Sequence, residues 1–275
     1  MKLSKTLIAL ALAGAAFSAQ AHKPWLLPSS SLVDSKDAWV TVDAAISEGL
    51  FDIDHQPLKL DGLTITGPDG AKVEMQNAMT GRLRSTFDVK LAKPGTYKIA
   101  LVNQSVMASW KVNGEVKRWR GSEAELAANV PAKADELNVS RTFGRLETFV
   151  SANTTDEAVF KPTGVGLELV PVTHPNDMRA GEEAKWKFLL DGKPAADQAF
   201  SLIPGGVRYR GTLGEIRMTT DAKGEVTFKI PQAGMYLVSS SWPAPPAAQA
   251  GQQAGPRPMP ARRVTYAATV EVLPQ

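Results

Sequence analysis

Hydrophobic and polar residues alternate with a period of two along most of this chain. Alternation of this kind places every second side chain on one face of a β-strand, so it predicts half-buried strands. In the first half, the alternating segments are 38–42, 58–66, 71–75, 84–91, 96–102, 106–112, 115–119 and 137–151. In the second half, they are 166–170, 183–189, 198–203, 215–219, 225–230, 235–240 and 263–273. The pattern predicts an all-β protein.

Turn-forming residues separate these segments, and helical signals are rare. Asn113-Gly114 has the composition of a two-residue hairpin turn. One short helix is predicted over 122–129, because Ser122 and Glu125 have the spacing of a capping box.

The rhythm of strands and turns divides the chain into two domains. We expect an N-terminal β domain over 22–160 and a C-terminal β-sandwich over 161–275, both antiparallel and of immunoglobulin-like size. Residues 243–260 are rich in Pro, Ala, Gln and Gly. They have too little apolar surface to order themselves, so a mobile insertion is predicted there.

The first 21 residues have the pattern of a cleaved secretory signal peptide. Lys2 and Lys5 precede an apolar run over 7–17, and Ala-Gln-Ala at 19–21 is a small-x-small cleavage pattern. This run is too short to span a bilayer, and no later stretch reaches the roughly 20 apolar residues that spanning needs. We therefore expect a periplasmic protein without a membrane span.

Composition narrows the possible partners. The formal net charge is only +3, and Lys2 and Lys5 of the expected signal supply two of these charges, so a nucleic-acid partner is not expected.

The 275 residues include no cysteine, and 43 % of them are hydrophobic. A chain of this length can therefore be held together by its core alone.

Cleavage after residue 21 makes His22 the first residue of the mature protein. The free α-amine and the ring Nδ1 of an N-terminal histidine can close a six-membered chelate ring on one metal ion. The reference pKa values, about 7.7–8.0 for the amine and about 6.5 for imidazole, let both groups release a proton to a metal near neutral pH. His22 is therefore the first candidate metal ligand.

An acidic loop supplies further candidate ligands. His55 follows Asp52 and Asp54, and Glu48 lies just upstream. The carboxylates can bind a metal or orient an imidazole ring. If His55 joins His22, one amine and two imidazoles form the T-shaped arrangement that holds copper, whereas nickel or cobalt would take further ligands. The alternative is an acidic surface loop without a site.

The remaining candidate is His174, which begins the second domain between turn-forming residues. It is either a third metal ligand or a residue of the turn. The sequence has no nucleophile frame of the G-x-S-x-G kind, no phosphate loop and no dinucleotide motif. We therefore assign no catalytic residue and no organic cofactor site.

Several short motifs resemble the DUF4198 family of exported β-rich proteins. They are His-Lys-Pro-Trp-Leu at 22–26, Ala-Lys-Pro-Gly-Thr-Tyr at 92–97, Gly-Val-Gly-Leu-Glu-Leu-Val-Pro at 164–171 with Pro175, Asp-Gly-Lys-Pro at 191–194, Thr-Asp-Ala-Lys-Gly at 220–224 and Gly-Met-Tyr at 234–236. The resemblance implies a periplasmic component of a cobalt or nickel uptake system. Such a protein would bind a divalent transition metal and pass it to a membrane transporter or outer-membrane receptor.

Three functions remain open at this point. The first is a non-enzymatic periplasmic carrier of nickel, cobalt or copper. The second is a copper oxidase or oxygenase that uses the same pair of histidines. The third is an exported structural or adhesion module that presents loops, including 243–260, to a membrane partner.

Overall fold

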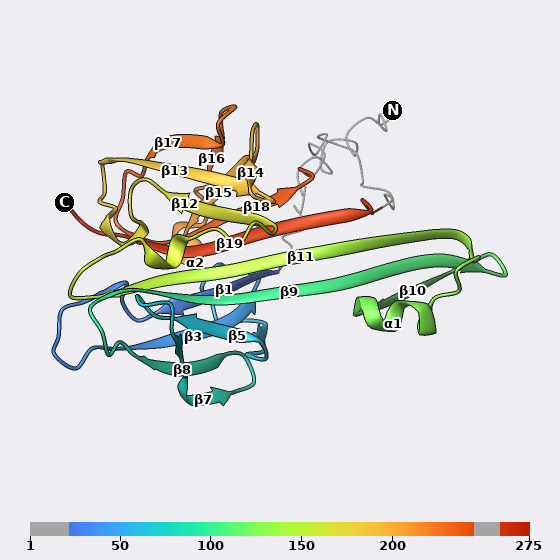
Figure 1. Cartoon of the computed structure of the whole chain (residues 1–275), viewed down its shortest axis with the longest axis horizontal. Helices are drawn as coiled ribbons and strands as arrows, with labels where there is room; N and C mark the ends of the chain where they lie inside the picture. Colours follow the sequence, from blue (N-terminus) through green and yellow to red (C-terminus); the bar gives the residue numbers. More distant parts are fainter. Residues whose placement is uncertain (1–21, 245–258) are drawn as a thin grey trace, which may run out of the picture.

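A computed structural model of the chain describes residues 22–244 and 259–275 and shows a protein built mainly from β-strands (Figure 1). The predicted all-β class, with two immunoglobulin-like sandwiches, is confirmed. The expected signal peptide and positions 245–258 of the expected insertion lie outside the described residues. Within the described ranges, no helix has the length and apolar character needed to cross a membrane.

One ten-stranded sheet runs through the whole molecule. Its order is β16-β15-β18-β19-β11-β9-β5-β6, with β10 paired to β9 and β2 paired to β11. The bounds are β2 (Leu32–Val33), β5 (Leu63–Thr66), β6 (Lys72–Val73), β9 (Gly95–Val112), β10 (Glu115–Gly121), β11 (Asp135–Ala152), β15 (Ala199–Pro204), β16 (Ile216–Thr219), β18 (Gly234–Trp242) and β19 (Arg262–Val272).

Two smaller sheets complete the sandwiches. The first contains β1 (Lys23–Pro28), β3 (Trp39–Ser47), β4 (Gln56–Pro57), β7 (Gln76–Thr80) and β8 (Ser85–Lys90). The second contains β12 (Leu167–Pro171), β13 (Glu183–Leu190), β14 (Lys193–Pro194) and β17 (Glu225–Lys229). The helical segments are α1 (Glu123–Asn129), α2 (Val207–Arg210), η1 (Ala158–Phe160) and η2 (Pro175–Asp177).

Strand β11 contributes to both hydrophobic cores. Phe149 packs in the core that contains Trp186 of the second small sheet. Leu146 and Val150 pack in the core that contains Phe87 of the first. Side chains alternate across a strand, so odd and even positions of β11 point into opposite cores. The two small sheets therefore lie on opposite faces of the large sheet (Figure 1).

The junction of the two sandwiches departs from the expected antiparallel arrangement. Strands β11 and β19 pair in parallel, from Arg141↔Arg262 to Thr148↔Thr269. The chain returns to the shared sheet as β19 only after it has formed the other strands of the second sandwich. Strand β19 then runs in the same direction as β11. The expected domain boundary near residue 160 falls at η1, between β11 and β12, while the sheet itself continues from one sandwich to the other.

The local turn and helix signals agree with the structure. Asn113 and Gly114 have φ of 51° and 82°, as a type I′ hairpin turn requires, and they join β9 to β10. Helix α1 begins with the predicted capping box, in which Ser122 donates its backbone N–H to Glu125 over 2.9 Å.

Strand lengths were predicted less well. The segments 96–102 and 106–112 form one strand, β9, because Asn-Gln-Ser at 103–105 contains neither Gly nor Pro to interrupt it. Strand β7 was missed because all of its residues are exposed and show no alternation.

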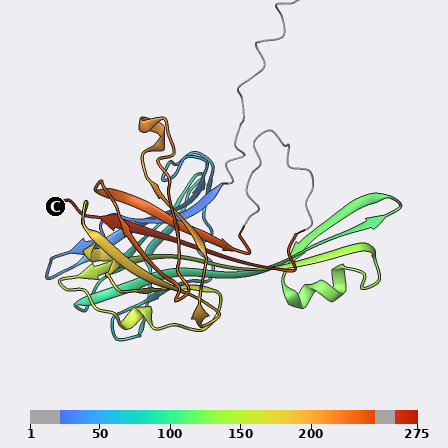
Figure 2. The same cartoon turned by 90° about the horizontal axis from the view of Figure 1, so that it is seen from above.

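The outer half of β9 leaves the body with β10, α1 and the first part of β11. These residues, 103–140, form an arm that projects from the sandwiches (Figure 2).

A charged cluster is buried where β11 faces the second sandwich. The Arg145 guanidinium donates to Glu147 and to Glu168, each over 3.3 Å, and all three side chains are less than 8 % exposed. Glu168 also accepts the backbone N–H groups of Thr163 and Gly164 over 2.8 Å. Arg145 is therefore the positive group that compensates two buried carboxylates.

Replacing Arg145 should be far more costly than replacing an exposed arginine. Arg145→Met leaves two buried carboxylates without their cation, so we expect the free energy of unfolding to fall by about 3–5 kcal/mol. The control is Arg217→Met, because the Arg217 side chain is 83 % exposed and its ion pair should contribute about 1 kcal/mol or less. Urea unfolding measures both variants, and equal losses would contradict the assigned role.

Candidate functional site

His22 and His55 are neighbours in the folded chain. Their ring centroids are 3.9 Å apart and their planes differ by 9°, so the imidazoles stack face to face. His22 directly precedes β1 and His55 directly precedes β4, and both of these strands pair with β3. The pairing of β1 and β4 with the same strand is what brings the two histidines together.

Glu48 contacts the outer nitrogen of His22. The Oε1 atom of Glu48 lies 3.3 Å from Nε2 of His22. The two side chains are 69 % and 43 % exposed, so the contact adds little stability and acts mainly on ring orientation. Within the described part of the chain, Nδ1 of His22 has no hydrogen-bond partner. Nδ1 is the ring nitrogen that the expected chelate at a cleaved N-terminus would use.

The carboxylates of both aspartates of the acidic loop make contacts within the protein. The carboxylate of Asp54 accepts the backbone N–H of Glu48 over 3.1 Å and that of Gly49 over 3.0 Å. Asp52 is turned towards Arg208 of α2, with 3.5 Å between Oδ2 and Nε. Both aspartates were candidate ligands. In this arrangement Asp54 fixes the backbone beside the histidines, and Asp52 connects the loop to the second sandwich.

Aromatic packing anchors the same loop to the second sandwich. Trp25 is fully buried and donates from Nε1 to Ser47 Oγ over 2.7 Å. Phe51 packs edge-on against Trp25, with 5.6 Å between ring centroids, and lies against Gly205. Phe51 has a φ of 63°, a strained value for a bulky residue that the surrounding packing must maintain. Trp25 therefore belongs to a hydrophobic core, together with Leu50 and Ile203.

Sequence reasoning missed two charged residues that lie beside the site, Glu215 and Arg208. Burial lowers the pKa of the Lys23 ammonium, and the carboxylate of Glu215 acts in the opposite direction. Arg208 contacts Asp52, as described above. Glu215 and Arg208 belong to the second sandwich, far from His22 in sequence, and no local pattern links them to the N-terminal segment.

His174 lies in a separate hydrogen-bond network. Its Nδ1 accepts the backbone N–H of Asn176 over 3.1 Å, so Nε2 carries the proton and faces Asp156 O at 3.1 Å and Thr96 Oγ1 at 3.0 Å. Its ring also meets Phe160 edge-on at 5.3 Å. Nδ1 is therefore engaged within the turn and Nε2 with Thr96 and Asp156, and we place His174 outside the candidate site.

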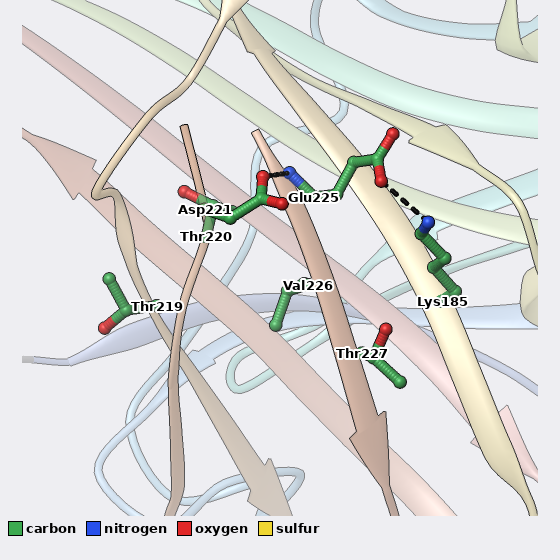
Figure 3. Close-up of a pocket in the computed structure, with 7 residues that line it drawn as sticks. All are labelled: Lys185, Thr219, Thr220, Asp221, Glu225, Val226 and Thr227. Carbon is green, nitrogen blue, oxygen red and sulfur yellow. Dashed lines mark hydrogen bonds and ion pairs between the residues drawn. The ribbon is translucent and has the colours of Figure 1, made fainter. Parts of the chain in front are cut away.

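Other parts of the described structure offer less chemistry. In the ranges 22–244 and 259–275, no group of three or more His, Cys, Asp or Glu side chains is arranged to hold a metal ion. An open hollow of about 510 Å³ lies on the second sandwich, lined by Lys185, Thr219, Thr220, Asp221, Glu225, Val226 and Thr227 (Figure 3). Its charged groups pair with one another: Lys185 with Glu225 over 2.7 Å, and Asp221 with the backbone N–H of Glu225 over 2.9 Å.

Comparison with known proteins establishes the family. Residues 19–244 match the domain of unknown function DUF4198, and the chain belongs to this family. No curated protein matches the chain.

The similar solved structures are remote. One is the D0-D1 domain of intimin, with 11 % identity and a TM-score of 0.21, covering 90 % of this chain and 97 % of that one. Another is the human OSCAR ligand-binding domain, with 12 % identity and a TM-score of 0.22, covering 92 % of this chain and 100 % of that one. Similarities at these TM-scores carry no functional argument.

The stability of the protein should depend on the protonation of His174. Burial is the main influence and lowers the pKa of His174, against the opposing effect of Asp177 and Asp156. The unfolded chain therefore binds a proton more readily, with a pKa of about 6.5. The contribution of neutral His174 is complete above that pH and is lost as the pH falls through it towards the folded pKa.

The test compares wild type with His174→Gln in urea at pH 7.5 and pH 5.5. We expect the variant to be less stable at pH 7.5 and the gap to narrow at pH 5.5. The control is Leu169→Ala, which removes a buried side chain without a titrating group and should give a gap independent of pH. A constant gap for His174→Gln would contradict the assigned protonation.

Proposed function

We propose that this DUF4198 protein is a non-enzymatic periplasmic carrier that binds one divalent transition-metal ion at its mature N-terminus. The observation that carries the proposal is the contact between Glu48 and Nε2 of His22, beside the stacked ring of His55. A carboxylate on the outer nitrogen of a metal-binding histidine orients the ring and raises its basicity. Nδ1, which has no hydrogen-bond partner among the described residues, is the nitrogen that the terminal chelate requires.

The proposed ligands are the α-amine and Nδ1 of His22 together with the imidazole of His55. In the stacked arrangement, the planes of the two rings are nearly parallel, so one ring has to turn before both nitrogens meet a single ion. Both histidines are exposed, and neither is locked by packing. The turn therefore requires only a change of side-chain rotamer.

The ligand set bears on the choice of metal and on release. Asp52 and Asp54 are held by Arg208 and by the loop backbone, which leaves a nitrogen-rich set suited to nickel, cobalt or copper. Three protein nitrogens leave coordination positions open to water or to ligands of a receptor. An exposed site with open positions suits a protein that hands its ion to a membrane transporter.

A metal titration tests the proposal. The protein is prepared with residues 1–21 removed, so that it starts at His22, and a second form carries one alanine before His22. We expect the first form to bind one equivalent of Ni²⁺, Co²⁺ or Cu²⁺ in calorimetry. The extended form lacks the amine ligand. Its affinity should therefore fall by more than the roughly 10–100-fold that is typical when an outer hydrogen-bond partner of a ligand is lost.

Substitutions separate the remaining roles. His55→Ala should weaken binding by removing a ligand, and Glu48→Gln should weaken it by about 10–100-fold. His174→Gln, the matched control at the third histidine, should leave affinity unchanged.

Equal binding by the form that starts at His22 and by the extended form would refute the terminal chelate. Rapid peroxide-driven turnover by the copper-loaded protein would instead favour an oxidase or oxygenase.

A further inference from the structure

In the part of the chain that the structure describes, the strand at the outer edge of the arm has one edge without a partner strand. Among the described residues, β10 pairs with β9 and with no other strand, so one of its two edges is free. The closing pair of the hairpin is Val112↔Glu115. In a two-residue hairpin this pair is hydrogen-bonded, and hydrogen-bonded pairs recur at every second residue. The backbone N–H and C=O groups of Val116, Arg118 and Arg120 therefore point to the free edge.

Two of these three residues, Arg118 and Arg120, are positively charged. The side chains of Arg118 and Arg120 lie on one face of β10, because they are two residues apart, and both are exposed. Neither makes an ion pair in the described ranges, which contain every Asp and Glu of the chain. Val116, 53 % exposed, adds apolar surface beside them.

The charge pattern selects the occupant of this edge. If β10 paired antiparallel with a second copy of itself about Arg118, that arginine would face its own copy, and Val116 would face Arg120. Like charges directly opposite one another are destabilising. Charged side chains on an edge strand also suppress such self-association. An extended segment with acidic residues at alternate positions would instead place a carboxylate opposite each arginine.

We propose that β10 is a docking edge for an extended acidic segment of a partner protein, which adds to the sheet as an antiparallel strand. Main-chain hydrogen bonds to Val116, Arg118 and Arg120 would supply affinity, and the two arginines would supply register and selectivity for Asp or Glu at every second position. The arm holds this edge away from the body, so a partner can approach it without meeting the sandwiches (Figure 2). The proposal does not depend on metal binding.

The probe is a fluorescein-labelled peptide of four Glu-Thr repeats, with binding to the full chain followed by anisotropy. We expect Arg118→Glu with Arg120→Glu to weaken binding by at least about tenfold, because two attractive pairs become repulsive. The matched control, Lys59→Glu with Arg82→Glu, makes the same change of charge at exposed positions of the first sandwich and should leave binding unchanged. Circular dichroism confirms that each variant is folded.

Two N-methylated peptides separate strand addition from charge attraction. A glutamate opposite Arg118 has its N–H directed at β10, whereas the threonine N–H groups point away. N-methylation of the glutamates should therefore weaken binding by at least about tenfold, and N-methylation of the threonines should not. Equal binding of the two peptides would overturn strand addition. Failure of the unmodified peptide to bind would overturn the proposal, as would arginine-dependent binding to phosphatidylglycerol vesicles in place of the peptide.

Discussion

The structure depends on one strand that is buried on both faces. Odd positions of β11, such as Phe149, fill the core of the second sandwich, and even positions, such as Val150, fill the core of the first. A slip of one residue would exchange every side chain between the two cores. It would also move Arg145 away from Glu168 and expose it to the first core. The register of β11 therefore fixes both sandwiches at once, which explains why a chain without cysteine can keep two domains in one orientation.

The candidate site combines a rigid base with exposed ligands. Trp25, Ser47 and Phe51 hold the acidic loop between the two sandwiches, and Asp54 fixes its first residues through two backbone N–H groups. The rings of His22 and His55 lie outside this packed base. A rigid loop sets the distance between the two rings, and their exposure leaves them free to turn. Such an arrangement would let the two rings turn towards the proposed ion without disturbing the core.

The sequence predicts most of the strands because alternation is a local signal. The hairpin at Asn113 and the capping box at Ser122 are local for the same reason. The sharing of one sheet between two sandwiches was not predictable, because it depends on the distant pairing of β11 with β19. In the site, the grouping of His22 with the acidic loop was one of two alternatives that the sequence left open, and the contact between Glu48 and His22 emerges only from the fold. The contact of Asp52 with Arg208 depends on the packing of the two sandwiches, which no pattern within either segment encodes.

The shared sheet also links the arm to the histidines. Strands β9 and β11 run without interruption from the arm into the body, where β11 packs near β1, the strand that His22 precedes. Strand β1 begins on the side of the body from which the arm extends (Figures 1 and 2). A partner strand added to β10 would therefore join the sheet that contains β11, the strand that packs near β1. The proposed docking edge and the candidate site are thus connected through the pairing of β10 with β9 and of β9 with β11, and through the packing of β11 near β1.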